Sequence, residues 1–206
     1  GVILNAEHPD PVSVRHVIGH YVPALTLGAS AHALPEVVPA AGAGALWSMD
    51  GGEPIVLVES ATIANGIAWS AEHSTMYWID TPTGSIDAFD YDLDIVRVSG
   101  PRPHDDFDEE WGSPDGMCID DEDRLWVAFW GGSAVRCLDG TDCVEMVELP
   151  TPLVTCPTFA GPDLDQLVIT TAAIDVPADS PGAGDVYLAT PGCTGPAPNR
   201  LGSWAG

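Results

Sequence analysis

The chain has 206 residues, 45% of them hydrophobic, and can bury one sizeable core without a second domain. Six basic residues, all of them arginine, stand against 31 acidic residues, and the resulting formal net charge of −25 repels nucleic acid and anionic membranes. No segment approaches the roughly 20 apolar residues of a membrane span, and the first residues lack the basic and apolar regions of a signal peptide. We therefore expect a cytoplasmic protein that binds neither nucleic acid nor membranes.

The five cysteines are odd in number and include no Cys-x-x-Cys pair. They are Cys118, Cys137, Cys143, Cys156 and Cys193. Neither a zinc knuckle nor a complete disulfide framework is indicated by these spacings. An intracellular, reduced protein is favoured.

From residue 46 onward the sequence repeats a pattern, and three copies can be superimposed. Each copy has one candidate strand, a polar turn, and a second candidate strand. These segments are rich in β-branched and aromatic residues, which are typical of strands rather than helices. The copies begin at 65, 115 and 155, and spacings of 50 and 40 residues fit a four-stranded propeller blade of about 40 to 50 residues. The predicted strands are 65–70 and 76–80, then 115–120 and 125–129, then 155–159 and 167–171.

Further segments fit the outer strands of the blades. They are 84–90, 133–138 and 185–189, with 45–48 and 55–58 in an earlier blade. The acidic run 105–110 is predicted to be a solvated loop between blades, whereas residues 1–44 lack alternation and receive no assignment. The sequence thus predicts an all-β protein, a β-propeller of about four blades over residues 45–206.

The innermost strand of every propeller blade lines the central channel, so equivalent positions in successive repeats meet around one axis. Asn65 and Asp115 are such equivalents, each directly before a glycine, and the third repeat has Thr155 there. Amide and carboxylate oxygens suit Ca²⁺, Mg²⁺ or Mn²⁺, and a site that keeps waters also accepts Zn²⁺. The alternative is that Asn-Gly and Asp-Gly are ordinary turn signals. Their matching register in two repeats favours a metal site.

Several longer motifs resemble one known family. The segment Asn-Gly-Ile-Ala-Trp-Ser at 65–70, the segment Asp-Ala-Phe-Asp-Tyr-Asp at 87–92 and the segment Pro-Asp-Gly-Met-Cys-Ile-Asp at 114–120 are similar to signatures of the SMP-30/gluconolactonase (regucalcin-like) family. The similarity continues in family order to the end of the chain. Members of this family are six-bladed propellers that bind one divalent cation and hydrolyse sugar lactones.

The resemblance implies that Asn65 and Asp115 are two metal ligands, with Ca²⁺ or Zn²⁺ as the first candidates and Mg²⁺ or Mn²⁺ also possible. It also implies that Asp115 is the base that activates water for attack on a small-molecule lactone. A non-catalytic propeller that binds a metal or a small ligand is the alternative.

The sequence departs from the family at its beginning. The family takes a third ligand, a glutamate, from a Gly-Glu-x-Pro-x-Trp segment that is absent here, and Glu7 or Glu36 could in principle replace it. No residue is assigned to substrate binding. We expect a chain truncated at the N-terminus by roughly two blades, with self-association through the open blade edges.

Overall fold

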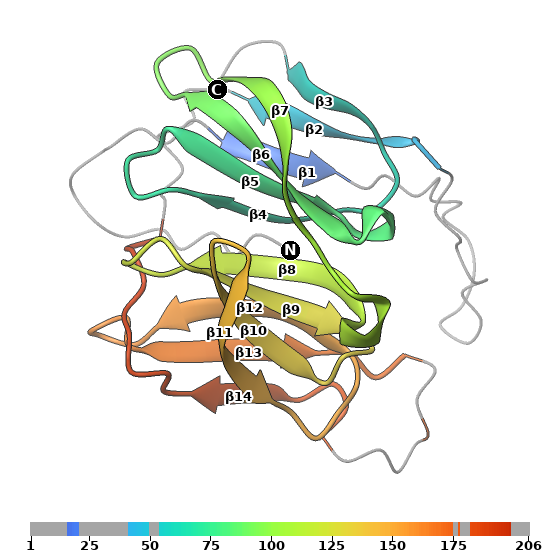
Figure 1. Cartoon of the computed structure of the whole chain (residues 1–206), viewed down its shortest axis with the longest axis vertical. Helices are drawn as coiled ribbons and strands as arrows, with labels where there is room; N and C mark the ends of the chain where they lie inside the picture. Colours follow the sequence, from blue (N-terminus) through green and yellow to red (C-terminus); the bar gives the residue numbers. More distant parts are fainter. Residues whose placement is uncertain (1–15, 21–40, 50–53, 175–176, 178–181, 199–206) are drawn as a thin grey trace, which may run out of the picture. The chain divides into compact units, whose positions relative to one another are not determined.

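The computed structural model describes residues 16–20, 41–49, 54–174, 177 and 182–198 (Figure 1). The chain divides into two compact units, Gly1–Ala64 with Arg200–Gly206, and Asn65–Asn199. The first unit holds one antiparallel sheet in the order β1-β2-β3. Its strands are β1 (His16–His20), β2 (Gly44–Met49) and β3 (Ile55–Ala61). The predicted strands at 45–48 and 55–58 are confirmed, and β1 lies in the segment to which no element was assigned.

The second unit contains three antiparallel sheets in succession along the chain, and in each the strands pair with their neighbours in sequence (Figure 1). The first sheet contains β4 (Ala64–Trp69), β5 (Thr75–Asp80), β6 (Ser85–Asp92) and β7 (Arg97–Asp106). The second contains β8 (Ser113–Ile119), β9 (Leu125–Trp130), β10 (Ala134–Asp139) and β11 (Asp142–Glu148). The third contains β12 (Val154–Ala160), β13 (Gln166–Thr171) and β14 (Val186–Ala189).

With the sheet of the first unit, the described residues form four sheets of the propeller-blade type, which confirms the all-β, β-propeller prediction. The two short 3-10 helices, η1 (Thr81–Thr83) and η2 (Glu109–Trp111), lie between strands. No helix in these described ranges has the length and apolar character needed to cross a membrane.

The core of the second unit lies between its sheets, and strand β9 shows why. All five residues from Leu125 to Phe129 are buried. Successive side chains of a strand point to opposite faces, so Leu125, Val127 and Phe129 pack toward the sheet of β4–β7, while Trp126 and Ala128 pack toward the sheet of β12–β14. A strand covered on both faces reads as a continuous apolar run, as this one does.

A buried carboxylate holds the hairpin between β8 and β9. Asp120 accepts hydrogen bonds from the backbone N–H groups of Glu122 (3.0 Å) and Arg124 (2.9 Å), from Arg124 Nε (2.8 Å) and from Trp126 Nε1 (2.9 Å). Its side chain is 0% exposed, so each lost partner would leave a buried polar group unsatisfied. The interaction fixes the turn that aligns β8 with β9.

Strand β7 corrects one prediction. Asp105 and Asp106 were expected in a solvated loop, but they end β7 and pair with Ile86 and Ser85 of β6. Pro101 and other residues that disfavour strands hid β7 in the sequence; an outermost strand tolerates proline because one edge forms no ladder. The other four residues of the acidic run, 107–110, lie outside the sheet.

Two further expectations concern cysteines and edges. All five cysteines are free thiols in the structure. Within the described residues, the third sheet ends at β14, where Val186 is 66% and Leu188 62% exposed. Self-association through such exposed blade edges stays a prediction. So does the domain boundary at residue 45.

Replacing Asp120 by alanine is expected to lower the free energy of unfolding by about 3 kcal/mol or more, because Arg124 and the indole N–H of Trp126 lose a buried acceptor. Chemical denaturation measures this. The exposed Asp163→Ala variant is the control and should lie within about 0.5 kcal/mol of the parent chain. Equal stabilities for both variants would contradict the role given to Asp120.

Candidate functional site

The inner strands β4, β8 and β12 approach each other closely at two glycines. A Cβ at Gly66 would lie 2.6 Å from the carbonyl oxygen of Asp115, and a Cβ at Gly116 would lie 2.7 Å from that of Thr155. Real Cβ atoms do not come so near a backbone atom, so only glycine fits at either position. The Asn-Gly and Asp-Gly pairs therefore lie inside strands, and the turn interpretation is wrong.

The regular strand pairing of β8 with β9 and of β12 with β13 is interrupted at the polar residues of the inner strands. In β8, Pro114 pairs with Phe129 and the next pair is Met117 with Val127, so Asp115 and Gly116 occupy a bulge. In β12 the pairing passes from Val154 directly to Cys156, which leaves Thr155 as the extra residue. Bulges re-aim side chains and are frequent beside active sites. The same device thus occurs at equivalent positions of two successive blades.

A chain of hydrogen bonds joins the side chain of Asn65 to the backbone beside Asp115. The hydroxyl of Thr81 donates to the carbonyl oxygen of Pro114 (2.8 Å) and accepts from Asn65 Nδ2 (3.0 Å). The Asn65 side chain also lies near enough to the Asp115 carboxylate to lower its pKa. The structure therefore brings Asn65 and Asp115 together, and it adds Thr81, which no sequence signal singled out.

Burial raises the pKa of Asp115 to about 6, although the nearby Asn65 side chain and the Gly116 N–H favour the ionised form. At neutral pH the group is therefore largely ionised, although burial makes its charged form unfavourable. A cation or a proton would relieve its desolvation. The site is poised to bind either.

The third inner position is already occupied by a polar pair. The hydroxyls of Thr155 and Thr170 lie 2.7 Å apart, and Thr170 also donates to the carbonyl oxygen of Cys156 (3.3 Å). Thr155 is thus an oxygen-bearing residue at the height of Asn65 and Asp115 in the repeat. Its hydroxyl is committed to β13 rather than to Asp115.

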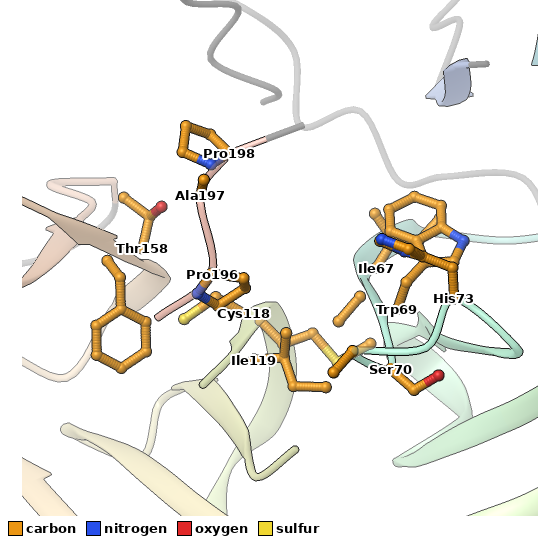
Figure 2. A pocket seen from close by; sticks show the side chains of 14 residues that line it. Ile67, Trp69, Ser70, His73, Cys118, Ile119, Thr158, Pro196, Ala197 and Pro198 are labelled. Carbon is orange, nitrogen blue, oxygen red and sulfur yellow. The ribbon is translucent and has the colours of Figure 1, made fainter. Parts of the chain in front are cut away.

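Two hollows lie on the second unit. One, of about 390 Å³, borders the Thr81 turn and is lined by polar groups that include Thr83, Asp106, Glu109 and Ser113. The other, of about 300 Å³, lies where the inner strands end, with Ile67, Ile119 and Phe159 among its mostly apolar lining (Figure 2). Asn65 and Asp115 line neither of these two hollows; their neighbour Thr81 lines the first.

The donor set suits a hard divalent cation only in part. Asn65 and Asp115 supply an amide oxygen and a carboxylate, which are ligand types for Ca²⁺ and Mg²⁺. Among the described residues, no three His, Cys, Asp or Glu side chains gather in a group that could hold a metal. Glu7 and Glu36, considered as a third ligand, lie outside the described residues.

A methyl group at position 116 should distort the site. We expect Gly116→Ala to lower the free energy of unfolding by about 2 kcal/mol or more, since the new Cβ meets Thr155 and Cys156 of the next inner strand. The control is Gly140→Asn, where φ is +60° with nothing within 4 Å of a Cβ and where asparagine tolerates the left-handed conformation. Thermal denaturation compares them. A Gly116→Ala chain as stable as the control would contradict the close approach.

Asp115→Asn should stabilise the metal-free protein. The pKa of Asp115 is raised to about 6 from 3.8, so its contribution to stability is present below pH 3.8 and is lost as the pH rises through about 6. The variant escapes this loss and should gain about 2 kcal/mol over the parent chain near pH 8, and almost nothing near pH 4. Denaturation in a chelator at both pH values measures the gain. A gain that does not depend on pH would rule out burial of this charge as its cause.

Comparison with known proteins places the chain in a family. The family description "SMP-30/Gluconolactonase/LRE-like region" matches residues 28–173. YvrE of Bacillus subtilis, a proposed sugar lactone lactonase, is 38% identical over 144 residues, which cover 67% of this chain and 49% of YvrE. Regucalcin of Danio rerio is 34% identical over 163 residues, covering 76% of this chain and 54% of its own. The chain spans about half the length of the curated relatives it matches.

Solved structures agree. A calcium-binding regucalcin from Agrobacterium tumefaciens superimposes with a TM-score of 0.75 and 26% identity, over 80% of this chain and 58% of that one. A luciferin-regenerating enzyme gives a TM-score of 0.71 and 32% identity, over 79% and 56% of the two chains. A gluconolactonase from Xanthomonas campestris gives 0.51 and 25%, over 67% and 43%. The protein belongs to the SMP-30/gluconolactonase/LRE-like family.

Proposed function

We propose that the protein takes part in the divalent-metal-dependent hydrolysis of sugar lactones, with Asn65 and Asp115 as metal ligands and Asp115 as the general base. The observation that carries the proposal is the close approach of the two inner strands beside these residues, where a Cβ at Gly66 would lie 2.6 Å from the carbonyl oxygen of Asp115. The effect of Asn65 on the pKa of Asp115 supports their proximity. The family match, the proposed lactonase activity of YvrE and the gluconolactonase among the structural neighbours support the substrate class.

The proposed reaction requires one proton acceptor and one Lewis acid. A bound divalent cation would act as a Lewis acid toward the lactone carbonyl. The Asp115 carboxylate accepts a proton from the water whose oxygen attacks the carbonyl carbon. The ring carbon–oxygen bond then breaks, and the leaving oxygen takes up a proton, so that one lactone and one water give one open-chain hydroxy acid. Asn65 lowers the pKa of Asp115 and so favours the carboxylate form, which is the form that accepts the proton.

A second candidate is a propeller that binds a cation without turnover. It is favoured by the ligand count, since the described residues supply two identified ligands whereas Ca²⁺ takes six to eight oxygens. The two candidates share the metal site and differ in hydrolysis. Binding and activity must therefore be measured separately.

The test uses the chelator-treated chain titrated with Ca²⁺, Zn²⁺ and Mn²⁺ by calorimetry, followed by acid release from gluconolactone. We expect weak metal binding, roughly micromolar or weaker, because few ligands are provided. Hydrolysis should disappear in Asp115→Asn, since an amide cannot accept the proton, and should persist in the exposed Asp163→Asn control.

Each other outcome has a distinct meaning. Hydrolysis that survives Asp115→Asn would remove Asp115 from the role of base. Metal binding by a chain that releases no acid would favour the second candidate. Submicromolar binding lost in Asp115→Ala would mean that a further ligand comes from residues outside the described part of the chain.

A further inference from the structure

The turn after β5 is built to hold one hydroxyl in a fixed place. Thr81 is the first residue of η1, Pro82 follows it, and the turn closes with the Gly84 N–H donating to the carbonyl oxygen of Thr81 (3.1 Å). Thr83 strengthens the turn by donating from its hydroxyl to the carbonyl oxygen of Asp80 (2.8 Å). The half-buried Thr81 side chain therefore has little freedom to move away from Pro114 and Asn65.

The hydrogen count of the Thr81 hydroxyl decides how the Asn65 amide lies. A hydroxyl has one hydrogen, and that of Thr81 is donated to the carbonyl oxygen of Pro114 at 2.8 Å. Toward Asn65 the same oxygen can only accept, so the amide must present its Nδ2 hydrogen there, at 3.0 Å. The reversed amide would place Oδ1 against an oxygen with no hydrogen between them. The two ends of the amide are nearly alike in shape, so shape does not decide the orientation. The hydrogen-bonding capacity of the Thr81 hydroxyl decides it.

The hydrogen bond from Nδ2 to Thr81 leaves the other end of the amide free of this contact. The Asn65 side chain also lowers the pKa of Asp115, which agrees with an amide hydrogen, and not Oδ1, being directed toward the carboxylate. Oδ1, a hard oxygen ligand, is the atom of the amide that is left for a cation.

We infer that Thr81 is a positioning residue, which fixes the Asn65 amide so that Nδ2 faces Thr81 and Oδ1 serves the cation. This inference rests on the proposed function for the role of Oδ1, whereas the orientation itself is a property of the metal-free chain. Partners of metal ligands that act in this way typically change metal affinity by 10- to 100-fold. The residue is absent from the repeat that predicted Asn65 and Asp115, because it lies in a turn and not at an inner-strand position.

A purely structural role for Thr81 must be distinguished from this one. Its bond to Pro114 also ties η1 to β8, and loosening the turn could disturb the site indirectly. Thr83→Val is the matched control, since it removes a hydroxyl that holds the same turn and leaves the Asn65–Thr81–Pro114 chain intact. Thr81→Val removes the acceptor at nearly constant shape, and Thr81→Ser restores it.

The first readout is the side-chain amide of Asn65 in the metal-free protein, followed by NMR and assigned by its absence in Asn65→Ala. In the parent chain and in Thr81→Ser, both amide hydrogens should be separately resolved and protected from exchange. In Thr81→Val the protection should fall about tenfold or more, while Thr83→Val should retain it. Loss of protection in Thr83→Val equal to that in Thr81→Val, or full protection in Thr81→Val, would overturn the inference.

The second readout is metal affinity in a double-mutant cycle. Thr81→Val should weaken Ca²⁺ or Mn²⁺ binding about tenfold in the parent chain, and less than about twofold in the Asn65→Ala background, because the hydroxyl acts through Asn65. Equal weakening in both backgrounds would contradict action through the amide. A parent chain with an ordered Asn65 amide but no metal binding would overturn the proposed function and leave the orientation by Thr81 established.

Discussion

The absence of two side chains is the constraint on which the rest of the site depends. Because Gly66 and Gly116 have no Cβ, the backbones of β4, β8 and β12 come within contact distance of one another, at 2.6 Å and 2.7 Å from the would-be Cβ atoms. Asn65 and Asp115 precede these glycines and are therefore brought together although they are 50 residues apart in the sequence. Any larger residue would separate the inner strands and, with them, Asn65 and Asp115.

This close approach also makes the carboxylate of Asp115 less stable in its ionised form. Packing the inner strands together removes water from Asp115, and desolvation raises its pKa to about 6 even though Asn65 and Gly116 favour the ionised form. The surrounding polar groups reduce the penalty without removing it. In the function proposed above, a cation that neutralised this carboxylate would recover the free energy lost by burying the charge.

Much of the fold followed from the sequence because its signals are local. The strands β4, β5, β8, β9, β12 and β13 carry repeated runs, and their repeat register placed Asn65 and Asp115 at equivalent inner positions. Strands β7 and β11 were missed, since prolines interrupt the pattern of the first and acidic residues interrupt that of the second. Thr81 could not be found at all. Its role depends on a contact with Pro114, 33 residues away, that no periodicity encodes.

The same dependence on tertiary contacts changes the meaning of common dipeptides. Asn-Gly and Asp-Gly are turn signals when the glycine supplies a left-handed conformation, as Gly84 does with φ of 67°. Gly66 and Gly116 are not among the residues with positive φ, and they serve close approach instead. The residue before such a glycine is placed by the neighbouring strand's backbone rather than by its own turn. The positions of Asn65 and Asp115 therefore depend on the packing of two blades, and a substitution in either blade is expected to displace both residues.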